Sequence, residues 1–130
     1  MPIPPNQLEE RGIKDQKVLQ AIRQVSRELF VPKKYQELAY ADSALPIDCG
    51  QTISQPFIVA YMTEQLALKE TDKVLEIGTG SGFQTAVLAQ LVKEVYTVEI
   101  HSKLSYQAQK LLTSLGYQNI FYQVGDGKLG

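Results

Sequence analysis

The sequence has little of several residue types that would each define a class of protein. Its 130 residues contain one cysteine, Cys49, and no tryptophan. One cysteine forms no internal disulfide, which excludes a disulfide scaffold and favours a reducing compartment. We interpret Cys49 as a small buried residue. No apolar run reaches the roughly 18 residues of a membrane span, and the N-terminal "MPIPPNQLEERG" lacks a signal-peptide core. We therefore expect a soluble cytoplasmic protein with no membrane partner.

An excess of one charge is also lacking. Thirteen Lys and Arg stand against fourteen Asp and Glu, which gives a net charge of -1. Binding to nucleic acid needs a basic excess or a basic stripe, so we expect no nucleic-acid partner. The hydrophobic fraction of 44% and the charged fraction of 21% are ordinary for a globular protein, and the length suits one core.

Residues 1–55 predict short helices followed by a long connection. Apolar residues recur at helical spacing over 14–30, where Asp15 is the expected N-terminal cap. A shorter helix is expected over 6–13, and residues 33–40 add one or two further turns.

The connection, residues 41–55, has no helical or strand period over most of its length. At most a short strand is expected around 51–53. Irregular segments of this length inside a compact domain are usually functional or disordered, and the apolar residues within this one favour an ordered, functional loop.

From Pro56 onward, strands and helices alternate. We expect a helix from Pro56 to about residue 68, strands over 73–77, 94–100 and 119–124, and helices over 83–92 and 102–116, with Ser102 as a cap and Gly116 as a stop. This alternation predicts an α/β fold with a parallel sheet whose strands lie in the order 3-2-1. The run "KVLEI" at 73–77 is typical of a strand buried on both faces.

A glycine-rich loop follows the first of these strands. Its glycines are Gly78, Gly80 and Gly82, a G-x-G-x-G spacing; the dinucleotide fingerprint G-x-G-x-x-G would need glycine where Phe83 stands. Glycines after a strand let the backbone turn tightly and approach a ligand. The alternative is a tight turn without a ligand, which three glycines in five residues disfavour. The candidate cofactor contacts here are Gly78, Thr79, Gly80, Ser81 and Gly82.

Two acidic positions indicate which ligand the loop binds. Glu99, 21 positions after Gly78, ends the second strand, where a carboxylate accepts hydrogen bonds from a ribose; NAD and S-adenosylmethionine share that group. Asp126 in "VGDG" follows the third strand and is placed to reach an adenine amino edge. The set resembles the motifs of class I methyltransferases, which implies S-adenosyl-L-methionine as cofactor, S-adenosyl-L-homocysteine as product, and Ile100 and Gly127 as further contacts.

The segment "YADSALPIDCGQTISQPFIVAYMTEQL", residues 40–66, is specific beyond the cofactor motifs. Together with "VLEIGTGSGFQTAVLA" and "GDGKLG", it looks like the protein-L-isoaspartate O-methyltransferase family, and the resemblance runs from about Arg27 to Gly130. The resemblance implies methylation of the α-carboxyl of L-isoaspartyl residues in damaged peptides and proteins, which initiates their repair through a succinimide. It also implies that Ser54 is the active-site serine, which hydrogen-bonds the substrate carboxylate.

Two other roles for Ser54 are a covalent nucleophile and a helix cap. The proposed reaction does not require the first, because the substrate carboxylate is already ionised at neutral pH and needs no general base. Ser54 as a covalent nucleophile would need an adjacent base, and the only histidine, His101, follows the second strand. The hydroxyl is also placed to cap the helix at Pro56. By position alone, Tyr40 and Asp42 are candidates to line the substrate loop.

The resemblance also sets expectations about the C-terminal end. In the family, "DGKLG" is typically followed by the rest of the catalytic domain, so we expect a truncated, single incomplete domain: 1–55 as N-terminal helices and substrate-side loop, and 56–130 as a cofactor-binding Rossmann-like half. The alternatives are a non-catalytic cofactor-binding fragment and a methyltransferase for another carboxylate or a small molecule; the segment "GQTISQP" argues against the latter. With no neighbour on one side, strand 73–77 has a free edge, and we expect self-association through it.

Overall fold

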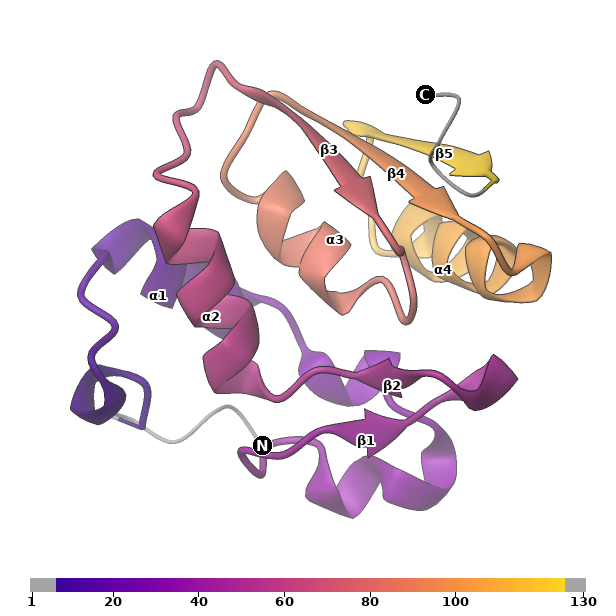
Figure 1. Ribbon diagram of the computed structural model, residues 1–130, viewed down its shortest axis with the longest axis horizontal. Helices are drawn as coiled ribbons and strands as arrows, with labels where there is room; N and C mark the ends of the chain where they lie inside the picture. The colour runs from indigo at the N-terminus through magenta and orange to yellow at the C-terminus, as the bar shows by residue number, and fades with distance from the viewer. Residues whose placement is uncertain (1–6, 126–130) are drawn as a thin grey trace.

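The computed structural model describes residues 7–125 and contains a three-stranded parallel sheet along one side of the molecule (Figure 1). The strands are β3 (Lys73–Ile77), β4 (Glu94–Glu99) and β5 (Ile120–Val124), in the spatial order β3-β4-β5. The predicted α/β class and the 3-2-1 order are confirmed. Buried β-branched residues recur along β4, the central strand of the three, which is paired on both edges.

Two helices connect these strands and lie on the same side of the sheet (Figure 1). They are α3 (Phe83–Ala89) and α4 (Ser102–Ser114). Gly116 follows α4 at φ 94°, as expected of a C-terminal stop. The expectation that Ser102 caps α4 is wrong: Ser102 is the first helical residue, and His101 occupies the cap position without a side-chain hydrogen bond.

The N-terminal region is helical but more broken than its periodicity predicts. It contains η1 (Glu9–Arg11), α1 (Gln16–Gln24), η2 (Arg27–Phe30) and η3 (Lys33–Leu38), of which all but α1 are short 3-10 helices. Asp15 caps α1, as predicted, because its carboxylate accepts the backbone N–H groups at positions 17 and 18.

The single helix predicted over 14–30 is wrong, because the chain turns extended at Val25 (φ -90°, ψ 122°). The break follows from burial of Arg27 and Phe30 on the segment beyond it. The Arg27 guanidinium donates to the Ala39 carbonyl at 2.6 Å and lies over the ring of Phe83, 5.0 Å from its centroid. Tertiary contacts of one buried cation therefore override the helical period.

The long connection is an ordered hairpin. β1 (Leu45–Pro46) pairs antiparallel with β2 (Thr52–Ile53), and the one-turn 3-10 helix η4 (Asp48–Gly50) joins them. Only the second of these strands was predicted. Cys49 lies in η4, exposed and with φ 61°, so its interpretation as a small buried residue is wrong. The hairpin leads directly into α2 (Pro56–Gln65), where Pro56 occupies the first turn.

The core lies between the N-terminal helices, α3, α4 and one face of the sheet. Phe83, Ile22, Leu112 and Val95 are among its fully buried side chains. The opposite face of the sheet is open. Within residues 7–125, no helix is long and apolar enough to cross a membrane.

Strand 73–77, whose apolar run is typical of burial on both faces, has one face exposed in the described part of the chain, in line with the expectation of an incomplete domain. Leu75 and Ile77 are 58% and 59% exposed. In the described part of the chain no layer covers this face, and β3 pairs only with β4.

Candidate functional site

The glycine loop connects β3 to α3 with its three glycines in the left-handed region. Their φ values are 94°, 56° and 90° for Gly78, Gly80 and Gly82. A Cβ on Gly82 would lie 3.2 Å from the Cβ of Ala108 and 3.3 Å from Leu112 Cδ1, so Gly82 also lets α3 and α4 pack closely. A Cβ on Gly78 would meet nothing within 4 Å. The first part of the loop is thus open to a ligand and the last part is packed.

A polar network lies beneath this loop. The Glu76 carboxylate accepts hydrogen bonds from the hydroxyls of Thr85 at 2.5 Å and Thr97 at 2.7 Å. Since Thr97 donates its one proton to Glu76, the 2.5 Å contact between Thr79 and Thr97 is donated by Thr79. The pKa of Glu76 is raised to about 7, chiefly by burial; the two threonine hydrogen bonds oppose this rise, and the charge of Glu99 contributes to it. Glu76 was not among the predicted site residues, although it is the acid that opens the E-x-G-x-G-x-G motif.

Glu99 lies at the end of β4 and is only 4% exposed. One carboxylate oxygen accepts the backbone N–H of Gly80 at 2.8 Å, and the other accepts that of His101 at 3.0 Å. Glu99 therefore fixes the glycine loop against the start of α4. Each oxygen has a second lone pair for a ligand hydroxyl. Ile100, the next residue, is 64% exposed beside this carboxylate.

Ser54 and the glycine loop, 24 or more residues apart in the sequence, line one small cavity of about 70 Å³. Its polar lining comprises Thr52, Ser54, Glu76, Gly78, Thr79, Gly80, Ser81 and Gln84. No histidine lines this cavity. The structure thus brings together the predicted catalytic serine and the predicted cofactor loop. The hairpin β1–β2 leads into Ser54 and places it beside this loop.

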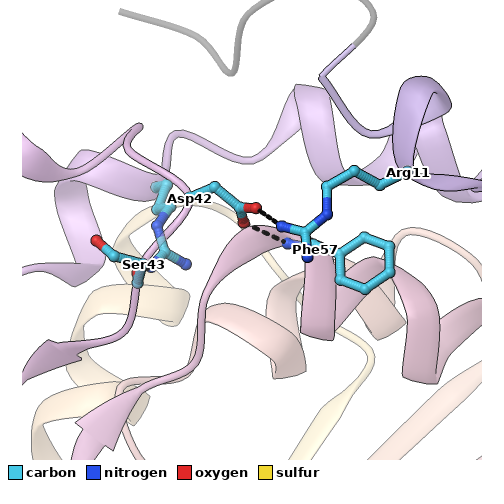
Figure 2. A network of polar contacts seen from close by, with 5 residues as sticks. Arg11, Asp42, Ser43 and Phe57 are labelled. Carbon is cyan, nitrogen blue, oxygen red and sulfur yellow. Dashed lines mark hydrogen bonds and ion pairs between the residues drawn. The ribbon is translucent and has the colours of Figure 1, made fainter.

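The hydroxyl of Ser54 does not cap α2. The cap position is Gln55, whose side chain makes no capping hydrogen bond. Instead, the Asp42 carboxylate accepts the N–H of Phe57 at 3.1 Å and forms an ion pair with Arg11 (Figure 2). The capping role considered for Ser54 is therefore filled by a residue from a distant loop.

Two other residues that the sequence analysis considered, Tyr40 and His101, do not line this cavity. The Tyr40 hydroxyl donates to Glu28 at 3.4 Å, and burial raises the pKa of Tyr40. His101 lies at the start of α4 with its backbone N–H on Glu99. Asp126 and Gly127 lie outside the described residues.

A glycine loop between a parallel strand and a helix, with a buried acid at the end of the next strand, is the arrangement of an α/β protein that binds a nucleoside-containing ligand. The sequence profile of the protein-L-isoaspartate(D-aspartate) O-methyltransferase family matches residues 5–130. The chain belongs to this family.

Individual relatives agree with this assignment. The chain is 60% identical over 123 residues to the protein-L-isoaspartate O-methyltransferase of Dictyoglomus turgidum, with 95% of this chain and 56% of that protein covered. A solved protein-L-isoaspartate O-methyltransferase superposes with a TM-score of 0.82 at 31% identity, over 92% of this chain and 40% of the other.

A Plasmodium falciparum structure assigned to the same type of enzyme, in complex with S-adenosyl-L-homocysteine, has the same fold. Its TM-score is 0.76 at 24% identity, over 90% of this chain and 59% of that one. The chain spans about half the length of the curated relatives it matches.

Proposed function

We propose that this chain carries the cofactor loop and the active-site serine of a methyltransferase that esterifies the α-carboxyl of L-isoaspartyl residues in damaged proteins and peptides. The observation that carries the proposal is the cavity shared by Ser54 and the glycine loop. The family match over residues 5–130 supports the substrate class.

S-adenosyl-L-methionine is the proposed cofactor, and the charges around the loop favour it over a dinucleotide. The carboxyl groups of Glu76 and Glu99 lie directly beneath and beside the loop. Negative groups there repel a pyrophosphate and attract the ammonium and sulfonium groups of adenosylmethionine. A cation near Glu76 also favours its ionised form, so binding lowers its pKa.

Each part of the cofactor has a proposed partner. The loop residues Gly78 to Gly82 face the methionine part, where the open space at Gly78 admits a ligand. Glu99 accepts the ribose hydroxyls, Ile100 packs beside the nucleoside, and Asp126 with Gly127 takes the adenine edge. When bound, adenosylmethionine supplies an electrophilic methyl group to the substrate.

The residues of the chain contribute orientation. An isoaspartyl carboxylate is ionised at neutral pH and is a nucleophile without deprotonation, so the site needs a group that orients it toward the methyl group. The exposed Ser54 hydroxyl is free to donate a hydrogen bond to this carboxylate. Fixing the two reactants in line lowers the barrier by several kcal/mol, up to about 7–11.

The test is incubation of the chain with methyl-labelled adenosylmethionine and two peptides that differ only in isoaspartate or aspartate at one position. Base-labile methyl ester on the isoaspartyl peptide alone is the expected result. Cofactor binding without transfer would instead indicate a non-catalytic binding unit, and equal transfer to both peptides or to unrelated acids would indicate another substrate.

A further inference from the structure

Ser54 stands one residue before Gln55, the cap position of α2, and three residues before Phe57, a separation across which a serine oxygen can accept a backbone N–H. The oxygen of a capping serine accepts the N–H two or three positions later. For Ser54 the first of these positions is Pro56, which has no N–H, and the second is Phe57. The Phe57 N–H is thus the one donor of the first turn that a capping Ser54 would use.

In the structure, the Phe57 N–H donates to the Asp42 carboxylate instead. One of its oxygens accepts the Phe57 N–H at 3.1 Å, and the other pairs with the Arg11 guanidinium, which lies over the Phe57 ring, 4.2 Å from its centroid (Figure 2). Arg11, Asp42 and Phe57 therefore form a closed triangle at the start of α2. A carboxylate at this end of a helix is also favoured by the helix dipole.

Asp42 is itself held in place from the core. The Arg27 guanidinium donates to the carbonyl of Ala39 at 2.6 Å and to that of Ser43 at 3.2 Å, on either side of Asp42. Arg27 is fully buried, so the segment 39–43 is fixed relative to the N-terminal end of α3.

We propose that Asp42 is a positioning residue for Ser54: by taking the Phe57 N–H, it prevents the serine from capping α2 and leaves its hydroxyl free for the substrate carboxylate. The substrate part of this inference rests on the proposed function. The competition between Asp42 and Ser54 for one donor does not, and it can be measured by stability alone.

The experiment is a thermal double-mutant cycle on the full chain. In the parent, Ser54→Ala shifts Tm by less than about 1 °C, because the hydroxyl caps nothing. In an Asp42→Ala background the serine becomes the cap, so Ser54→Ala then lowers Tm by roughly 3 °C. Asp42→Asn retains an acceptor oxygen and restores the parent behaviour.

The matched control is Asp15→Ala, which removes the carboxylate cap of α1 and leaves the start of α2 unchanged. In that background Ser54→Ala stays without effect. Equal shifts for Ser54→Ala in the parent and in Asp42→Ala would overturn the inference. So would a shift of roughly 3 °C in the parent or in Asp42→Asn, since either shows that the hydroxyl already caps α2.

The peptide assay adds the functional consequence. Asp42→Ala is expected to lower methyl transfer to the isoaspartyl peptide several-fold at unchanged cofactor affinity, and Asp42→Asn to preserve it. Transfer that is absent in the parent contradicts the proposed function, and the thermal cycle then decides the inference about Asp42 by itself.

Discussion

Glu76 places a carboxyl group under the glycine loop with a pKa raised to about 7, from an ordinary value of 4.5, chiefly by burial. Between these two pH values the folded protein keeps a proton that the unfolded chain has released. Stability is therefore greatest below about pH 4.5 as far as this group is concerned, and it falls as pH rises to about 7.

We expect Glu76→Gln to remove this dependence. The stability of the glutamine variant relative to the parent should rise between pH 4.5 and 7, by on the order of 1–3 kcal/mol. Urea unfolding across this range measures the difference, with Glu94→Gln at the far end of β4 as the control. Parallel curves for Glu76→Gln and the parent would contradict the raised pKa.

Glu99→Ala is expected to weaken binding of S-adenosylhomocysteine by about 1–3 kcal/mol, the typical effect of leaving buried polar partners unmatched. The variant removes the proposed ribose acceptor and the acceptor of the Gly80 N–H. Calorimetry measures the affinity, and Glu94→Ala, at the opposite end of the same strand, should leave it unchanged. An unchanged affinity in Glu99→Ala would remove this residue from the ribose site.

Ser54→Ala is expected to lower methyl transfer roughly 10–100-fold, as for one lost hydrogen bond to a charged group, with cofactor affinity nearly intact. The readouts are transfer to the isoaspartyl peptide and calorimetry with adenosylhomocysteine. Ser114→Ala, whose hydroxyl bonds the carbonyl of Leu111 at the end of α4, is the control. Equal loss of transfer and of cofactor affinity would show that Ser54 shapes the cofactor pocket instead.

At the scale of elements, the contact between α3 and α4 depends on Gly82. Alanine there is strained at φ 90° and would also place its Cβ 3.2 Å from that of Ala108. We expect Gly82→Ala to destabilise the fold by about 2–4 kcal/mol. Gly116 has φ 94° with open space around it, so Gly116→Ala measures the loss of folding stability from backbone strain alone, about 1–2 kcal/mol. Equal losses in urea unfolding would exclude a packing role for Gly82.

The strands and the two helices between them follow from local patterns. Short β-branched runs bounded by turns predict β3, β4 and β5 to within one residue at each end. The expected helix over 14–30 fails at Val25, because local period carries no information about Arg27, which must reach the Ala39 carbonyl.

At the scale of the whole molecule, one face of the sheet and the outer edge of β3 are uncovered in the described part of the chain. Leu75, Tyr96 and Phe121 form one row across this face, and the rings of Tyr96 and Phe121 stack at 4.9 Å. With Ile77, these side chains form an exposed apolar patch on the order of several hundred Å², which is typical of an interaction surface.

We propose that this chain self-associates through the patch and the free edge of β3. Sedimentation across a concentration series should show a weight-average mass that rises with concentration. Leu75→Lys places a charge on the edge and should shift the equilibrium to monomer. Leu115→Lys, the same change at an exposed leucine on the helical side, should not. A parent that stays monomeric throughout would contradict the proposal.

The sequence by itself determined the parallel strands, the glycine loop and the family, because each rests on residues that are neighbours in the chain or recur at a fixed period. It also placed Ser54 and Glu99 among the candidate residues. Neither result required knowledge of which segments meet in space.

Only the tertiary structure decided how these parts act on one another. Folding places Ser54 beside the glycine loop. It also brings the Asp42 carboxylate to the Phe57 N–H and the Glu99 carboxylate to the Gly80 N–H, and each carboxylate accepts a hydrogen bond there. Each of these contacts joins residues 15 or more positions apart. The physical reason is that a hydrogen-bonding group takes whichever partner the packed chain brings within reach, and several acceptors of equal chemistry compete for each donor.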